Sequence, residues 1–335
     1  MSRYLKYQIL ICSISYCLYF ISNITVFSII PILICLNKLK NVFHILIIFI
    51  CIAAYFLIVD WYNSKDILLM SFSIILFSSN FNKYPLEVLK LNAYAILAML
   101  LYLLFNEPKG GWDQVLNFSM RLSYDLPTGK YINPNPLGLV AAICSFSFII
   151  NKKYFFAAIP FIIMIFTQSR AAILLFGLVI LIYNRVSLKY IISLIMSVLA
   201  LYYIFYDTPL MNRFLTEGDS GRGEFLDFYT NILKHSYLTG YSSRALDNIY
   251  FESGRTIDNM YYSLALRYGI IMGSGILFIF IVLFFINKID ETYRVRIAIF
   301  LAMLAYGFFE KGFLFFYMMW IPFSVCFNNL KKANI

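Results

Sequence analysis

Long apolar runs, broken at intervals by a few polar residues, occupy most of this 335-residue chain. Hydrophobic residues make up 61% of the sequence and charged residues 13%, about half the charged share of soluble domains. A single soluble core cannot bury this much apolar surface, so lipid must solvate the remainder. The composition therefore excludes a soluble enzyme, a secreted disulfide scaffold and a disordered chain, and it predicts an all-α membrane protein.

The spacing of the polar breaks predicts about twelve transmembrane helices in one membrane unit that covers residues 1–335, with no soluble domain boundary. The first apolar run, 7–36, is too long for one ordinary span, so we divide it at Ser22 and Asn23. The predicted spans are 5–21, 23–37, 42–59, 66–81, 88–106, 136–150, 154–168, 171–184, 187–206, 259–286, 295–309 and 312–328.

Basic residues divide unequally between the two sides of this predicted bundle. The short connections of one side hold Lys65, Arg170 and Lys311, and those of the other side hold Arg3, Lys6, Lys38, Lys40, Lys83, Lys90, Lys152, Lys153, Arg185, Lys189, Lys288, Arg294, Arg296, Lys331 and Lys332. The richer side is cytoplasmic by the positive-inside rule, and both termini lie there. The net charge of +10 is therefore an orientation signal and does not indicate nucleic-acid binding.

Two long polar segments, 107–135 and 207–258, both fall on the outer side, and long ordered loops are usually functional. In the second segment, apolar residues follow the helical spacing i, i+3, i+4, i+7, i+8 at Phe225, Phe228, Tyr229, Ile232 and Leu233. This pattern predicts an amphipathic helix over 223–235, which lies at the membrane interface or covers a cavity. The unpaired N–H groups at its beginning, beside Arg222, favour an anion.

Three outer clusters, 167–172, 220–224 and 258–270, carry the candidate chemistry through Arg170, Arg222 and Asp258. Arginine suits phosphate, and a carboxylate suits the deprotonation of a hydroxyl. Together they indicate transfer of a group from a phosphate leaving group to a hydroxyl acceptor. Simpler roles stay open: a helix-end arginine that reaches water, a solvated loop arginine, and an aspartate that caps the next helix. Gly269 and Gly273 allow a bend or tight packing in that helix.

Other residues have weaker signals. His235 is either a base or a polar surface residue, and Arg244 contacts either phosphate or anionic lipid headgroups. All six cysteines lie in apolar runs as small hydrophobic residues, and no metal-binding spacing or P-loop occurs. The sequence thus predicts a metal-independent site without a cofactor. Charged residues are nearly absent from the spans, which argues against an ion-coupled transporter.

The order of the motifs is characteristic: Ser169-Arg170 before an apolar helix, Gly221-Arg222 in the long loop, then Asp258-Asn259-x-Tyr261 leading to Tyr268-Gly269-Ile270. Over residues 130–290 it resembles the superfamily of O-antigen polymerases (Wzy) and O-antigen ligases. The resemblance implies a bacterial inner-membrane glycosyltransferase with a periplasmic active face. Such an enzyme uses undecaprenyl-pyrophosphate-linked sugars and inverts the anomeric configuration of the sugar that it transfers.

The resemblance also implies roles for individual residues. Arg170 and Arg222 would neutralise the departing pyrophosphate, and Asp258 would position or deprotonate the acceptor hydroxyl. The ligases carry a histidine where this chain has Asp258, and polymerases often have Asp-Asn there. The substrate-binding residues implied beside them are Arg255, Arg267, Asn259 and Tyr261, with His235 and Arg244 as the further candidates named above.

The predicted function is therefore a polymerase that joins lipid-linked repeat units into O-antigen or capsule, as in lipopolysaccharide biosynthesis. Two alternatives stay open: an O-antigen ligase that transfers polymer to lipid A–core, and a flippase for lipid-linked oligosaccharides. Membrane lipid is an expected partner, and a chain-length regulator protein is a partner implied by the resemblance.

Overall fold

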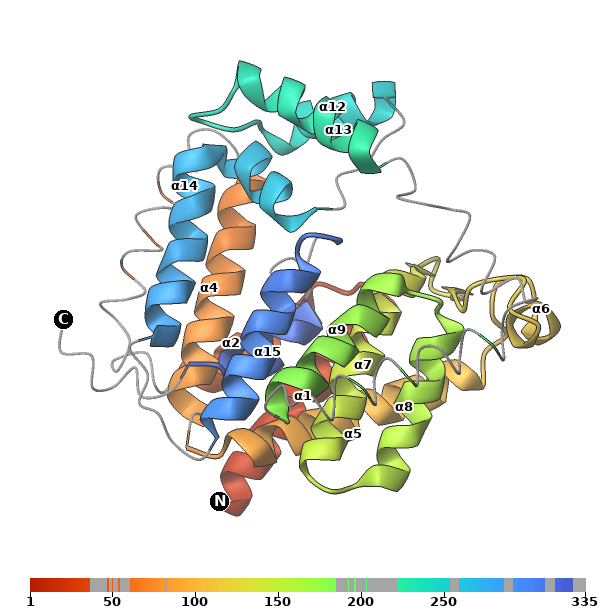
Figure 1. Cartoon of the computed structure of the whole chain (residues 1–335). Coiled ribbons are helices and arrows are strands. Elements are labelled where there is room, and N and C mark those ends of the chain that lie inside the picture. Colours follow the sequence, from red (N-terminus) through yellow and green to blue (C-terminus); the bar gives the residue numbers. More distant parts are fainter. Residues whose placement is uncertain are drawn as a thin grey trace.

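The computed structural model describes residues 1–36, 61–81, 83–184, 222–253, 259–285, 292–310 and 317–327, with isolated residues 47, 50, 54, 192, 196 and 203 (Figure 1). The described elements are α1 (Arg3–Ser22), α2 (Val26–Cys35), α4 (Trp61–Phe81), α5 (Pro85–Leu104), α6 (Trp112–Leu116), β1 (Tyr124–Asp125), β2 (Tyr131–Ile132), α7 (Pro134–Ile150), α8 (Tyr154–Phe166), α9 (Arg170–Tyr183), α12 (Arg222–His235), α13 (Ser243–Ser253), α14 (Met260–Phe285), α15 (Tyr293–Tyr306), η3 (Tyr317–Met319) and α16 (Trp320–Ser324). The described chain is mostly helical, as the sequence predicts, and β1 and β2 form one small antiparallel hairpin. Predicted spans 42–59 and 187–206 lie almost entirely outside the described residues.

Within the described residues, α1, α5 and α14 are long and apolar enough to cross a membrane. Five shorter helices are also apolar: α2, the 68–81 part of α4, α7, α8 and α9. Many large apolar side chains on these helices are exposed, including Phe155 at 79% and Phe278 at 63%. Lipid is the solvent that suits such surfaces, and the helices therefore support a membrane protein.

The division of the first apolar run is confirmed. Asn23 ends α1 in the left-handed conformation, with φ 58°, and its N–H donates to the carbonyl of Tyr19 at 2.9 Å. Asparagine tolerates this conformation better than most residues, so the chain turns here and α2 begins at Val26.

Helix α7 lies at the centre of the bundle, packed against α5, α8 and α9, and α15 packs against α9. Gly138 of α7 makes the close approach to the turn before α9 possible. A Cβ atom at this position would lie 2.7 Å from Oγ1 of Thr167 and 2.9 Å from Cβ of Ser169. The absence of a side chain at Gly138 thus brings the 167–169 turn against α7.

Gly269 bends α14, as expected from the sequence. Its φ of 75° and ψ of 163° belong to a region that only glycine adopts readily. The segment between α12 and α13 fits into this bend, where Ile270 N–H donates to Tyr237 (2.7 Å) and Tyr241 N–H donates to Leu266 (2.6 Å). The helix does not bend at Gly273, but this glycine allows its two parts to pack closely, since a Cβ there would lie 2.9 Å from the carbonyl oxygen of Leu264.

Helices α12 and α13 form a small cap with the first turns of α14. Buried Tyr229, Leu246 and Leu266 make its core, which is separate from the main core of the bundle. The predicted amphipathic helix is confirmed as α12, which buries Tyr229 and exposes Asp227. The prediction of one helix in this long loop is incomplete, because α13 also folds, with Leu246 and Ile249 facing the cap.

Among the described residues, connections lie at two ends of the bundle. At one end, Asn151 Nδ2 donates to the carbonyl of Leu86 at 3.3 Å, and the N-terminus lies at this end (Figure 1). At the other end, Met260 N–H donates to Gly307 (2.8 Å), and α12 and α13 lie across it (Figure 1). We call this second end the polar end.

One charged side chain departs from the expected pattern. Arg296, counted above with the cytoplasmic basic residues, is 1% exposed inside the packing of α15, and it is the largest fully buried side chain in the described residues. Arg296 is therefore an exception within a set of spans expected to be nearly free of charge, since its side chain is covered by its neighbours while Arg294 of the same turn is exposed.

Candidate functional site

Arg170 is the first residue of α9, and a short turn presents it at the polar end. Ser169 caps the helix, and its Oγ accepts the N–H of Ala172 at 3.4 Å. Gln168 has a left-handed φ of 50° and donates its amide to the carbonyls of residues 118 and 120, at 3.2 and 3.0 Å. The first long loop thereby holds the turn in place, and Arg170 is half-buried beside it.

A polar network joins four segments next to this turn. Arg121 donates Nε–H to the carbonyl of Thr167 at 2.9 Å and donates from its guanidinium to Oδ1 of Asn135. Asn135 donates Nδ2–H to Oε1 of Glu310 at 2.6 Å, and its carbonyl accepts the hydroxyl of Tyr306 at 3.4 Å. The network thus connects the first loop, the turn before α9, the beginning of α7 and the end of α15.

No sequence motif points to Arg121, Asn135 or Glu310. Arg121 and Asn135 lie at different places in the first long loop, and Glu310 lies 175 residues further along the chain than Asn135, so no local pattern connects the three. The run Asn133-Pro134-Asn135-Pro136 does predict a helix start, because proline is favoured in the first turn of a helix. Its two asparagines are therefore held in fixed positions at the beginning of α7.

Replacing Asn135 by alanine should lower the stability of the folded protein by about 1–3 kcal/mol, because Arg121 and Glu310 each lose a partly buried hydrogen bond. Thermal unfolding of the purified protein in detergent measures the change. Asn106→Ala is the matched control, since Asn106 bonds to Tyr102 of its own helix end. An equal loss in both variants would contradict a tertiary role for Asn135.

Asn259 and Tyr261 hold the beginning of α14 against α15. Oδ1 of Asn259 accepts the N–H groups of Tyr261 and Tyr262 at 2.9 and 3.1 Å, and Nδ2 donates to the carbonyl of Phe308 at 2.9 Å. The hydroxyl of Tyr261 donates to the carbonyl of Leu304 at 2.7 Å. Asn259 therefore provides the helix cap that the sequence analysis considered for Asp258.

The remaining predicted residues are distributed over the cap and its edges. His235 ends α12 and Arg244 lies on α13, and both are exposed. Arg267 is half-buried beside Tyr250; burial raises the pKa of Tyr250 to about 12, and the positive charge of Arg267 opposes that rise. Arg222 begins α12, but its side chain lies outside the described residues, as do Arg255 and Asp258.

A chain of contacts connects the cap to the turn before Arg170. Thr230 of α12 and Tyr262 of α14 share a hydrogen bond of 2.8 Å. The beginning of α14 is bonded to the end of α15, as described above, and Glu310 continues from there to the network of Arg121 and Asn135. The structure thus brings α12 and the Arg170 turn to the same polar end.

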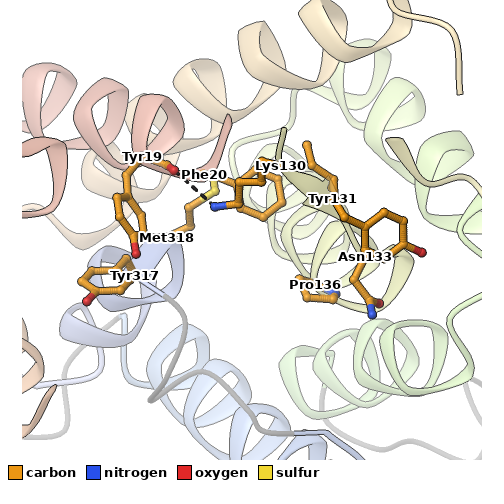
Figure 2. A pocket seen from close by; sticks show the side chains of 9 residues that line it. Tyr19, Phe20, Lys130, Tyr131, Asn133, Pro136, Tyr317 and Met318 are labelled. Carbon is orange, nitrogen blue, oxygen red and sulfur yellow. Dashed lines mark hydrogen bonds between the residues drawn. The ribbon is translucent and has the colours of Figure 1, made fainter. Parts of the chain in front are cut away.

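A cavity of about 240 Å³ opens at the polar end, between the last turns of α1, the hairpin and η3 (Figure 2). Lys130 lies over the rings of Tyr19 and Phe20, with Nζ 5.1 and 5.7 Å from the ring centroids. Burial lowers the pKa of Lys130 below its ordinary value of 10.5. In the sequence this lysine is an ordinary residue of the first long loop, because the aromatic walls come from distant segments.

No group of three or more histidine, cysteine, aspartate or glutamate side chains gathers at one place among the described residues. That part of the chain therefore offers no candidate metal centre. Its five described cysteines are free and buried in the apolar core, as expected for small hydrophobic residues.

The polar end thus combines Arg121, Lys130, Arg170 and Arg267 with carboxamide and carboxylate groups at one end of an apolar bundle. Guanidinium and ammonium groups in such a place suit phosphate held close to a membrane surface. Comparison of the chain with protein-family models, with curated proteins and with solved structures finds no match, so the functional assignment depends on this geometry and on the sequence motifs.

Proposed function

We propose that this protein is a polysaccharide polymerase of the bacterial inner membrane. It transfers glycan from an undecaprenyl-pyrophosphate carrier to the hydroxyl of a lipid-linked acceptor repeat unit at the periplasmic face. One observation carries the proposal: the turn that presents Arg170 and the helix that begins at Arg222 belong to the same polar end of an apolar helical bundle. A lipid-anchored diphosphate requires cations at this depth, at the boundary between hydrocarbon and water.

In the proposed reaction, the acceptor hydroxyl attacks the anomeric carbon of the donor sugar. The bond between that carbon and the carrier phosphate oxygen breaks, and its electron pair stays on the pyrophosphate. Arg170 and Arg222 stabilise this developing charge, which is where fixed cations lower a barrier most. Asp258 accepts the proton of the hydroxyl, and a single displacement of this kind inverts the anomeric carbon.

The network of Arg121, Asn135 and Glu310 supports the site from the side of the bundle. Arg121 fixes the carbonyl of Thr167, three residues before Arg170, and Asn135 ties that arrangement to the end of α15. A cation held by a rigid turn stabilises charge without reorganising during the reaction. We infer that these three residues position Arg170 and that Asn259 and Tyr261 position the beginning of α14.

Deletion of the gene tests the function through the lipopolysaccharide that the cell makes. A polymerase deletion leaves core that carries a single repeat unit, and this is the expected gel pattern. Bare core together with accumulated lipid-linked polymer would identify a ligase instead. Bare core with unpolymerised units retained on the cytoplasmic side would identify a flippase.

The orientation of the chain can be tested by reporter fusions. Fusions after residues 115 and 230 should report a periplasmic location, and fusions after residues 152 and 290 a cytoplasmic one, because basic connections stay inside. Each site is fused to two reporters, one that is active only in the periplasm and one that is active only in the cytoplasm, so that each fusion controls for the other. A cytoplasmic signal at residue 230 would place the cap on the wrong side for periplasmic chemistry and would remove the proposal.

A further inference from the structure

We propose that the cavity between α1, the hairpin and η3 binds one negatively charged sugar residue, whose charge is a phosphate or a carboxylate. The inference rests on the proposed function, because it names a substrate class for the same polar end. It assigns that end a subsite separate from the turn of Arg170, none of whose residues line the cavity.

The charge preference follows from Lys130. Its Nζ is 3.3 Å from Oδ1 of Asn23 and 3.4 Å from the carbonyl of Tyr19, and both partners are neutral. No carboxylate of the described residues lies within ion-pair distance of Lys130. A half-buried ammonium whose contacts are two aromatic rings and long hydrogen bonds to neutral oxygens is stabilised further by an anion.

The preference for a sugar follows from the walls. Tyr19 and Tyr317 pack against each other with ring centroids 4.6 Å apart. The ring centroid of buried Trp320, which is 2% exposed, lies 4.3 Å from that of Tyr317. These rings are therefore held rigidly on one side, and Tyr131 and Asn133 lie on the opposite side (Figure 2). Aromatic faces suit the apolar face of a sugar ring, and a carboxamide suits its hydroxyl groups.

The side chain of Asn133 already uses its oxygen in a hydrogen bond, so its amide nitrogen is the group that can bind a ligand. Its Oδ1 caps α7 by accepting the N–H of Asn135 at 2.9 Å, so its Nδ2 remains a donor for a hydroxyl oxygen of a ligand. The cavity therefore presents one cation, one amide donor and aromatic walls.

The size of the cavity limits the occupant to a single ring. Its volume of about 240 Å³ lies below the range of about 300–1,000 Å³ for sites that hold drug-sized ligands. Asn133 also directly precedes the helix start that carries Asn135 of the polar network. A bound sugar thus lies beside that network, as expected for one unit of a longer chain that extends along the polar end.

Binding can be measured by saturation-transfer NMR on the full-length protein in nanodiscs of purely zwitterionic lipid. The probes are glucose 1-phosphate, glucuronate, glucose and inorganic phosphate. We expect glucose 1-phosphate or glucuronate to bind at least about tenfold more tightly than glucose or inorganic phosphate. Lys130→Ala should reduce that affinity at least about tenfold, and Lys130→Arg should retain most of it, because the loss corresponds to one charge-assisted contact.

Lys109→Ala is the matched control. Lys109 belongs to the same loop and lies 5.2 Å over the ring of Tyr131, but it is exposed, pairs with Asp125 at 3.6 Å and does not line the cavity. Its removal should leave binding unchanged. Tyr131→Ala provides a second cavity variant that should fold, since this side chain is 47% exposed, and it should weaken binding of the charged sugar.

Three results would overturn the inference. Inorganic phosphate that binds as tightly as glucose 1-phosphate would show a simple anion site, and equal binding by glucose would remove the role of charge. Displacement of the probe by phosphatidylglycerol added to the nanodiscs would assign the cavity to a lipid headgroup. The two proposals can fail separately. If the charged sugar binds but deletion of the gene leaves the polymer ladder intact, the subsite stands and the polymerase function is rejected.

Discussion

Replacing Arg170 by alanine is expected to abolish the polymer ladder while the amount of protein in the membrane stays the same. Arg170 begins α9 on a turn that Ser169 and Gln168 hold in place through hydrogen bonds of their own, so these bonds remain in the variant. The variant should lose at least about 10²-fold in rate, the cost of removing one group that stabilises charge in a transition state. Gel analysis of lipopolysaccharide and immunoblotting of membranes measure both quantities.

Arg222→Ala should give the same loss, because the proposed reaction uses both cations. Arg294→Ala is the matched control, since Arg294 is an exposed arginine at the opposite end of the bundle and should leave the ladder unchanged. Arg170→Lys should recover little of the polymer ladder, because an ammonium group cannot form the two parallel hydrogen bonds that a guanidinium group makes to a phosphate. A normal ladder in Arg170→Ala would remove this arginine from the mechanism.

Replacing Gly269 by alanine is expected to release the cap from the bundle. The residue has φ 75° and ψ 163°, and a Cβ atom there would overlap the carbonyl oxygen of Leu238. The strained backbone alone costs about 1–3 kcal/mol, and the overlap adds to it because backbone atoms on both sides cannot move apart without breaking the bonds of Tyr237 and Tyr241. Limited proteolysis of the connection between α12 and α13 should be faster, and the polymer ladder should be lost.

Gly275→Ala is the control for this substitution. Gly275 lies in the same helix, and a Cβ atom there meets open space, so alanine should be neutral or slightly stabilising. Protease resistance in Gly269→Ala equal to that of the unchanged protein would contradict the role assigned to the bend. The two glycines thus separate the effect of a backbone contact from that of glycine content in the helix.

Features that depend on neighbouring residues in the chain could be predicted from the sequence. The break at Ser22 and Asn23, the amphipathic stripe of α12 and the bend at Gly269 all have local physical causes: turn tolerance, helical period and freedom of φ. The second cap helix had a comparable signal, since Leu246, Ile249 and Tyr250 follow helical spacing. That stripe is short and mixed with polar residues, and its burial depends on Tyr229 and Leu266, which come from other helices.

The sequence by itself determined the apolar character of this protein and the positions of most of its described apolar helices, because hydropathy and helical period act over neighbouring residues. The predicted span 312–328 is an exception, since η3 and the five-residue α16 are the helices described there. Only the tertiary structure decided which polar groups meet. Glu310 joins Arg121 and Asn135 of the first long loop from the far end of α15, and the distant walls around Lys130 come from α1 and η3. Such contacts form because packing of apolar helices brings distant segments together, and no local pattern records which ones will face each other.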